Sequence, residues 1–207
     1  MRCRLDVMGF WSKLWPFAKA DLIAEHPAAA LETFRRTHRA LAKANIPHAM
    51  IGGLALGALG IPRLTKDVDY LIEPEQKLRV AAIMVALGFQ QVEDNETFSS
   101  FVFDVYMRVD FLHARSDRTR TMLHNARREQ YQGTEMLVVQ PEDLIGLKLQ
   151  ALKNRPWHSS DRADIERVVD SYAKQLDLSR IRDYCQVLEL PDELERIIAR
   201  INGAATG

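Results

Sequence analysis

The sequence has few cysteines, no long apolar run and no excess of charge of either sign. Its two cysteines, Cys3 and Cys185, are too far apart for a disulfide framework or a cysteine metal site. Two reduced thiols are typical of a cytoplasmic protein, and we expect that location. No apolar stretch reaches the length of a membrane span. The 28 basic and 28 acidic residues balance, which excludes a uniformly basic nucleic-acid-binding surface but not a local basic patch.

Several catalytic signatures are also missing. No Gly-Lys-Ser/Thr motif is present, which argues against a P-loop ATPase. Serine, histidine and aspartate form no hydrolase elbow, and the six histidines form no metal cluster. With 207 residues, 47% of them hydrophobic and 27% charged, the chain is an ordinary globular protein that can bury a real core.

The pattern of the chain divides it into three parts. Residues 1–24 form an N-terminal extension, in which the apolar stretch Met8–Phe17 indicates a short docking helix or an irregular start, with a membrane-surface role as the alternative. Residues 25–140 mix predicted strands and helices. Residues 141–207 show only helical periodicity, so we expect a small C-terminal helical domain.

The predicted elements follow from hydrophobic periodicity and from glycine and proline breaks. Helices are predicted over 28–44, 76–87, 141–154, 161–173, 178–188 and 192–201, with a short helix after a turn in 52–60. Strands are predicted over 48–51, 68–72 and 136–140, and a hairpin over 98–104 and 106–113. The charged run 115–131 is interpreted as helix or loop, whose arginines either contact RNA or form a solvated face.

Three aspartates on predicted strands are the most informative feature. Asp67 and Asp69 are two residues apart, so both carboxylates lie on one face of their strand. Two like charges side by side are destabilising, and Mg²⁺ is an economical counter-charge because it prefers carboxylate oxygens. With Asp110 on a neighbouring strand, the three could hold two ions for an in-line phosphoryl displacement. The alternative is a solvated edge strand.

The pair Gly52-Gly53 strengthens the phosphate interpretation. The two glycines follow a predicted strand and open a helix, and thirteen residues separate them from the aspartate pair. Backbone N–H groups at such a turn can bind phosphate oxygens without obstruction from side chains. The combination is more specific than either motif alone.

The order of Gly-Gly, short helix, Asp67-Val-Asp69 and a later strand aspartate resembles the nucleotidyltransferases of the DNA polymerase β superfamily. The stretch Arg63–Asp69 and the tail Pro141–Leu152 are similar to the minimal and AbiEii-type toxin branch. The resemblance implies an α+β fold: a polymerase-β-like nucleotidyltransferase core with a mixed sheet, followed by a small C-terminal helical domain. One departure stands out, because many relatives have Gly-Ser where this chain has Gly52-Gly53.

The resemblance also implies an activity. Asp67 and Asp69 would bind Mg²⁺, or Mn²⁺, and Asp110 would complete the metal site and act on the attacking hydroxyl. The reaction would move a nucleoside monophosphate from an NTP to a hydroxyl acceptor and release pyrophosphate. The toxin-like features favour a tRNA or protein acceptor and a cognate antitoxin as partner. The alternatives are a small-molecule, antibiotic-type acceptor, a non-catalytic nucleotide-binding or interaction module, and a metal-dependent phosphohydrolase.

Five further residues are candidates for the nucleotide site. Lys148 falls within the apolar arc of its helix, so it needs an anion, either a carboxylate or a triphosphate, unless its stem reaches solvent. Arg63 and Lys66 either contact phosphate or balance the nearby aspartates. Asp161 and Asp164 share a helix face; they suit a helix start, and in the resembling branch an aspartate here lies near the lysine.

Overall fold

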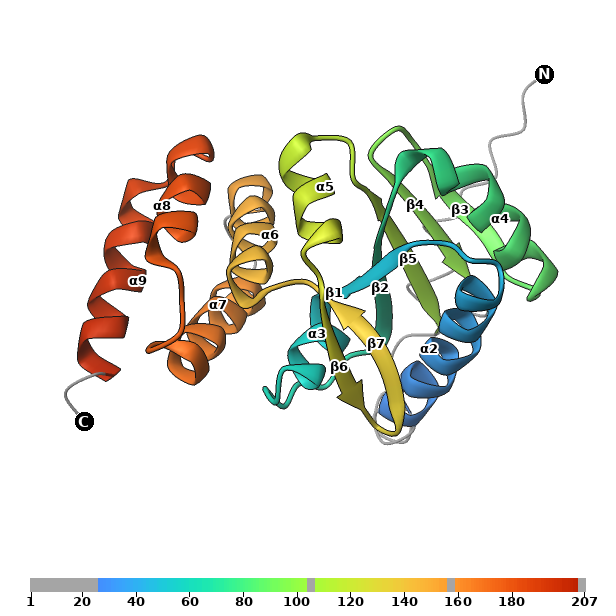
Figure 1. The fold of residues 1–207 in the computed structure, drawn as a ribbon, viewed down its shortest axis with the longest axis horizontal. Coiled ribbons are helices and arrows are strands. Elements are labelled where there is room, and N and C mark those ends of the chain that lie inside the picture. Colours follow the sequence, from blue (N-terminus) through green and yellow to red (C-terminus); the bar gives the residue numbers. More distant parts are fainter. Residues whose placement is uncertain (1–25, 104–106, 156–158, 205–207) are drawn as a thin grey trace, which may run out of the picture.

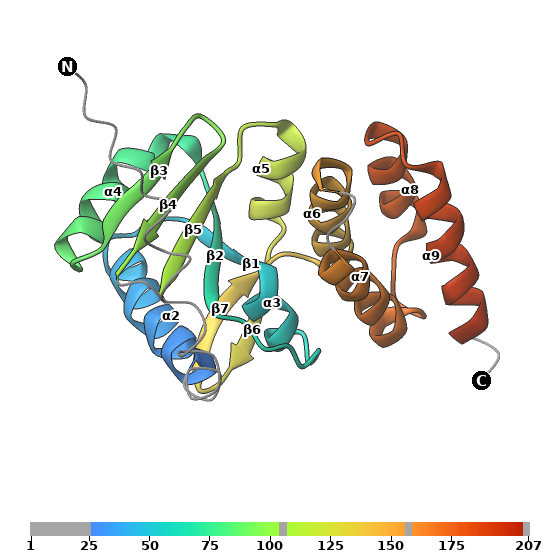
Figure 2. The ribbon, with the colours of Figure 1, turned by 180° about the vertical axis from the view of Figure 1, so that it is seen from behind.

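The structure, a computed structural model, describes residues 26–103, 107–155 and 159–204. The predicted extension 1–24, with its apolar stretch Met8–Phe17, lies outside the described residues. Figure 1 shows a sheet with flanking helices at one end of the molecule and helices α6 to α9 gathered at the other. Figure 2 shows the same two-part arrangement from behind.

One mixed sheet of seven strands forms the first part. Its order is β3-β4-β5-β2-β1-β7-β6. The pairs β2–β5 and β1–β7 are parallel, and the other neighbours are antiparallel. The strands are β1 His48–Ile51, β2 Asp67–Ile72, β3 Gln90–Asp94, β4 Phe98–Val102, β5 Arg108–His113, β6 Arg127–Tyr131 and β7 Thr134–Val138. The α+β class with a mixed sheet is thus confirmed.

The helices agree with the predicted ranges to within a few residues. They are α2 His26–Lys43, α3 Gly52–Ala58, α4 Lys77–Ala86 after a 3-10 turn at Pro74–Gln76, α5 Asp117–His124, α6 Pro141–Asn154, α7 Ser159–Tyr172, α8 Leu178–Val187 and α9 Pro191–Ala204. Helix α6 begins at Pro141, the position at which the sequence pattern becomes helical.

Two strands depart from the sequence prediction. No strand is expected at Gln90–Asp94, and the run 115–131, expected as helix or loop, ends in strand β6. Both β3 and β6 lie at the edges of the sheet. Every residue of β3 is exposed, and β6 consists mainly of charged and polar residues, so neither shows the apolar alternation that marks a half-buried strand. Their neighbours in the sheet, rather than their own composition, fix their conformation.

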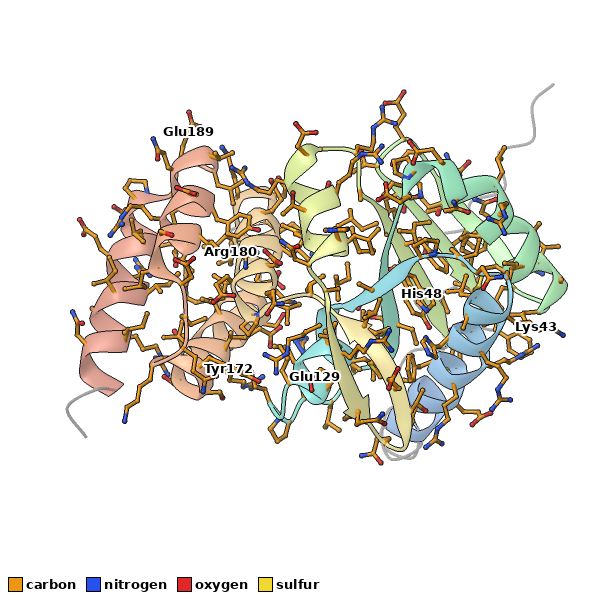
Figure 3. The ribbon with its side chains drawn as sticks, viewed as in Figure 1. Lys43, His48, Glu129, Tyr172, Arg180 and Glu189 are labelled. Carbon is orange, nitrogen blue, oxygen red and sulfur yellow. The ribbon has the colours of Figure 1, made fainter. Side chains whose placement is uncertain are left out.

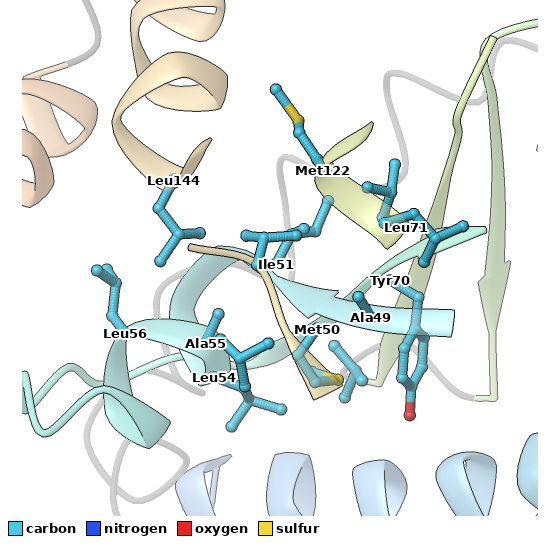
Figure 4. Packing of buried hydrophobic residues seen from close by; sticks show 14 of the residues in the cluster. Ala49, Met50, Ile51, Leu54, Ala55, Leu56, Tyr70, Leu71, Met122 and Leu144 are labelled. Atoms are coloured by element: carbon cyan, nitrogen blue, oxygen red, sulfur yellow. The ribbon is translucent and has the colours of Figure 1, made fainter. Parts of the chain in front are cut away.

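The two faces of β2 have different surroundings. Tyr70 points toward α2, where its hydroxyl lies 2.7 Å from Thr37 Oγ1, and Leu71 points to the opposite face (Figure 4). Asp67 and Asp69 alternate with buried Val68 and Tyr70, so they share the face of Leu71. The apolar side is covered by α2, and the carboxylates face the side toward the helical part.

The helical part is joined to the sheet by apolar packing. Leu144 of α6 belongs to the same buried cluster as Ile51 and Leu56, and Figure 4 shows it above the end of β1. The Tyr172 hydroxyl donates to the Leu59 carbonyl at 2.8 Å. Figure 3 labels Tyr172 and Arg180 at the helical end of the molecule. These contacts join α6 and α7 to the sheet part of the molecule at the end of β1 and next to α3.

Candidate active site

Strand pairing brings the three aspartates together. In the parallel pair of β2 and β5, Asp69 lies opposite Asp110 and Asp67 lies opposite Arg108. On the other side of β2, Ile51 lies opposite Asp69, so the end of β1 leads directly into the site. The three carboxylates line one cavity of about 850 Å³. Residues far apart in the chain therefore form one acidic site.

The electrostatics of these carboxylates indicate that they are crowded. Burial, followed by the charges of Asp110 and Asp67, raises the pKa of Asp69 to about 7. Burial, followed by the charge of Asp110, also raises the pKa of Asp67. A shift in this direction means that the charged form is disfavoured in the absence of a cation. The site therefore offers the oxygen donors that a hard divalent metal prefers.

The third carboxylate already has a cationic partner. Arg108 Nε donates to Asp110 Oδ1 at 2.8 Å and to Oδ2 at 3.1 Å, and the Ser100 hydroxyl donates to Oδ1 at 2.6 Å. In the described part of the chain, no group of three or more His, Cys, Asp or Glu side chains is arranged to hold a metal ion as it stands. The three carboxylates have the chemistry to fit a divalent cation, and Asp110 is engaged by Arg108 and Ser100.

The two glycines are required by close packing. Gly52 has φ +68°, and a Cβ atom on it would lie 2.0 Å from Asp69 Oδ2. A Cβ atom on Gly53 would lie 2.7 Å from Thr65 Cβ and 2.8 Å from Thr65 Oγ1. The departure from Gly-Ser thus has a physical reason: the Thr65 side chain takes the room that a serine side chain would need. Both glycines and Thr65 line the cavity.

Lys148 forms ion pairs with two aspartates, as expected for a lysine on the apolar face of its helix. Its Nζ lies 2.8 Å from Asp161 Oδ1 and 2.9 Å from Asp164 Oδ2. Arg63 also pairs with Asp164, which is completely buried. Lys148, Arg63 and Asp161 line the cavity, whereas Asp164 stands behind them and is not among the lining residues. Asp161 thus pairs with Lys148, and Asp164 pairs with both Lys148 and Arg63.

Lys66, like Asp164, is a predicted site residue that does not line the cavity. Its side chain is exposed, although its charge still lowers the pKa of Asp67. Charge balance describes this position better than a direct contact.

Other lining residues are harder to recognise in the sequence. Arg108 could have been found, because it is two residues before Asp110 on a predicted strand and so shares its face. Thr65 precedes the strand and has no special pattern. Glu93 reaches the cavity from β3, a strand that the sequence does not predict, and Phe98 lines it from β4.

The family described as "Uncharacterised nucleotidyltransferase" matches residues 17–202. The chain belongs to this family. It is accordingly an enzyme of the nucleotidyltransferase class, as the motif order Gly52-Gly53, Asp67-Val-Asp69 and Asp110 implies. Among curated proteins, no match to this chain was found.

Three solved structures share the fold at low sequence identity. ANT(2'')-Ia in complex with adenylyl-2''-tobramycin has a TM-score of 0.61 at 15% identity, covering 77% of this chain and 96% of that one. An antigenic nucleotidyltransferase-like protein from Paracoccidioides brasiliensis has 0.52 at 17%, covering 84% and 92%. A putative nucleotidyltransferase from Thermotoga maritima has 0.50 at 14%, covering 64% and 90%. They support a polymerase-β-like nucleotidyltransferase fold.

In the part of the chain that the structure describes, no helix has both the length and the apolar character needed to cross a membrane.

Proposed function

We propose that this enzyme transfers a nucleoside monophosphate from an NTP to a hydroxyl acceptor with the help of a divalent metal, and releases pyrophosphate. The observation that carries the proposal is the register of β2 and β5, which sets Asp69 opposite Asp110 in a cavity that also contains Gly52 and Lys148. Carboxylates for a metal and donors for phosphate are thus found in one cavity.

Asp67 and Asp69 are the proposed metal ligands, and Asp110 completes the set. Bound Mg²⁺, or Mn²⁺ in its place, would neutralise charge on the phosphates and favour deprotonation of the acceptor hydroxyl. Asp110 would accept the hydroxyl proton or orient the acceptor oxygen. The new bond joins that oxygen to the α-phosphorus, and the α–β phosphate bond breaks as pyrophosphate leaves.

The same cavity is proposed to bind the triphosphate. Lys148 and Arg63 have N–H donors there, and Gly52 and Gly53 offer backbone N–H groups with no side chain of their own in the way. Asp161 and Asp164 are proposed to act through Lys148 and Arg63, because these aspartates bond those cations and hold their charged ends in place. Lys66 is proposed to contribute charge only.

The acceptor is the finer part of the proposal. The toxin-like pattern Arg63–Asp69 favours a tRNA or protein acceptor with a cognate antitoxin as partner. A small hydroxylated molecule is the second candidate, and the charge of the cavity wall favours it. The lining has five acids, Asp67, Asp69, Glu93, Asp110 and Asp161, and four bases, Arg63, Arg108, Lys148 and Arg155. An RNA-binding rim would be predominantly basic.

The test is a transfer assay with each labelled NTP and Mg²⁺ or Mn²⁺. The acceptor pools are total RNA, a protein extract and a panel of hydroxylated small molecules, with pyrophosphate measured in parallel. We expect label in one pool and matching pyrophosphate release. The double variant Asp67→Asn/Asp69→Asn should lose transfer, while Asp170→Asn, an exposed carboxylate that pairs with Arg200, should retain it.

Each rival function gives a different result in the same assay. Release of phosphate without label transfer indicates a phosphohydrolase. NTP binding by calorimetry with no turnover in any pool indicates a non-catalytic module. Equal transfer by wild type and the double variant would exclude the carboxylate mechanism.

A further inference from the structure

Arg108 occupies an unusual position for an arginine in a proposed metal site. It lies on β5, two residues before Asp110, so both side chains share one face of the strand. Across the strand pair it lies opposite Asp67. Its guanidinium contacts both oxygens of Asp110 through Nε, at 2.8 and 3.1 Å. A cation thus already occupies the place where a metal would meet the third carboxylate.

Asp110 has little capacity left to bind a metal while its contact with Arg108 persists. Its Oδ1 accepts from the Ser100 hydroxyl at 2.6 Å as well as from Arg108. Within the described ranges, no trio of His, Cys, Asp or Glu side chains is arranged for a metal. Strong charge-assisted hydrogen bonds of this kind compete directly with metal coordination. Asp110 would become a ligand only if Arg108 moved.

Arg108 has a second partner within reach. Its Nη2 atom lies 4.0 Å from Glu93 Oε2 on the edge strand β3. Its Cζ lies 5.9 Å from the centroid of the Phe98 ring. The Arg108 side chain is 43% exposed and that of Glu93 52%, so neither is fixed by surrounding core. A rotation of the guanidinium away from Asp110 would bring it closer to Glu93 without leaving it unpaired.

We propose that Arg108 is a displaceable internal cation that pairs with Asp110 in the metal-free protein and turns to Glu93 when a divalent metal binds. It is a positioning residue that sets metal affinity. The competition makes metal binding weaker than three free carboxylates would give. This inference rests on the proposed function, since it requires that Asp67, Asp69 and Asp110 bind a metal.

The test measures Mn²⁺ binding to the nucleotide-free protein from the electron paramagnetic resonance signal of free Mn²⁺. This readout does not depend on enzymatic activity. Arg108→Gln removes the competing cation, and we expect binding about tenfold tighter. Glu93→Gln removes the second partner, and binding should weaken by about threefold. Arg108→Lys keeps the charge without the planar fork and should fall between wild type and Arg108→Gln.

Lys66→Gln is the matched control. Lys66 is an exposed cation whose charge also acts on Asp67, but it makes no hydrogen bond to Asp110. Its removal should change Mn²⁺ affinity by less than about threefold, since exposed charges interact weakly. If Lys66→Gln tightens binding as much as Arg108→Gln, general electrostatics explains the effect and the proposal fails.

The melting temperature gives a second readout, which shows whether a variant has a folding defect. Without metal, Arg108→Gln should melt below wild type because the carboxylates lose a counter-charge, and saturating Mn²⁺ should close the difference. Unchanged or weaker Mn²⁺ binding by Arg108→Gln would overturn the role of Arg108 alone. Absence of Mn²⁺ binding in wild type and all variants would instead overturn the proposed metal site.

Discussion

Asp69 Oδ2 lies 2.0 Å from the point that a Cβ atom on Gly52 would occupy. The proposed phosphate turn and the proposed metal-binding strand are therefore built against each other, with no room for a side chain between them. Because β1 leads into Gly52 and pairs with β2 at Ile51 and Asp69, any shift at one motif is passed to the other.

Replacing Gly52 with alanine should disrupt the site. The substitution meets Asp69 and also forces a residue with a side chain to φ +68°. We expect destabilisation by about 1–3 kcal/mol and a loss of transfer activity larger than that of the control. Gly60→Ala is the matched control, because Gly60 has φ +78° and open space around its Cβ position. Chemical denaturation and the transfer assay measure both effects, and equal losses in the two variants would contradict the steric account.

Gly53 and Thr65 should behave as a coupled pair. Gly53→Ser introduces a Cβ atom 2.7 Å from Thr65 Cβ, so this single variant should lose stability. In the double variant Gly53→Ser/Thr65→Gly the clash is removed. We expect a coupling free energy of about 1 kcal/mol or more in a double-mutant cycle. Strict additivity of the two unfolding free energies would show that Thr65 does not fill the place of the serine.

Lys148 should contribute more to stability than a lysine on the exposed side of the same helix. Lys148 is 16% exposed and pairs with two aspartates that are 5% exposed or less, so Lys148→Met leaves buried carboxylates without this partner. We expect a cost of about 2–4 kcal/mol.

The control for Lys148 is Lys153→Met on α6. Lys153 pairs with Glu189, which is 84% exposed, and such surface pairs are worth only about 0–1 kcal/mol. Urea unfolding of both variants measures the difference. Similar losses would mean that the pairs of Lys148 are screened by solvent like those of Lys153.

A histidine pair outside the cavity lining should make a contribution to stability that is lost on acidification. His38 Nδ1 and His48 Nε2 lie 2.8 Å apart, and Figure 3 labels His48 within the sheet end of the molecule. Burial, together with the charge of His38 and against the hydrogen bond to the Ile46 carbonyl, lowers the pKa of His48 to about 4. Burial also lowers the pKa of His38.

The sign follows from proton uptake. Below the ordinary histidine pKa of about 6.5 the unfolded chain takes up protons that the folded chain does not. The stability from neutral His48 is thus complete above about pH 6.5 and is lost as the pH falls toward 4, by about 1–3 kcal/mol. His48→Gln should reduce this slope, while His124→Gln, at an exposed position, should keep it. Parallel pH–stability curves for wild type and His48→Gln would contradict the prediction.

Much of the local structure could be read from the sequence because it depends on neighbouring residues. Helix α6 occupies the predicted range 141–154, since Pro141 fits the first turn of a helix and the apolar spacing continues to its end. The two-residue spacing of Asp67 and Asp69 likewise settles that they share a face. The edge strands β3 and β6 were not predictable, because their exposed and polar residues carry no alternation.

The candidate site shows the same division. That Lys148 needs an anion follows from its apolar helix face alone, but the sequence leaves open whether a phosphate or a carboxylate supplies it. The structure sets Asp161 and Asp164 beside Lys148 through the packing of α6 against α7. The contact of Arg108 with Asp110 likewise depends on the side-chain conformation in the folded protein.

The sequence by itself identified the residues that are proposed to carry the chemistry: the glycine turn at Gly52, the strand carboxylates Asp67 and Asp69, and the later Asp110. Their spacing and strand periodicity are properties of the local chain. Only the tertiary structure decided that Asp69 lies opposite Asp110 and that Gly52 packs against Asp69. Strand register and close packing arise from hydrogen bonds and contacts between segments distant in the chain, which local patterns do not specify.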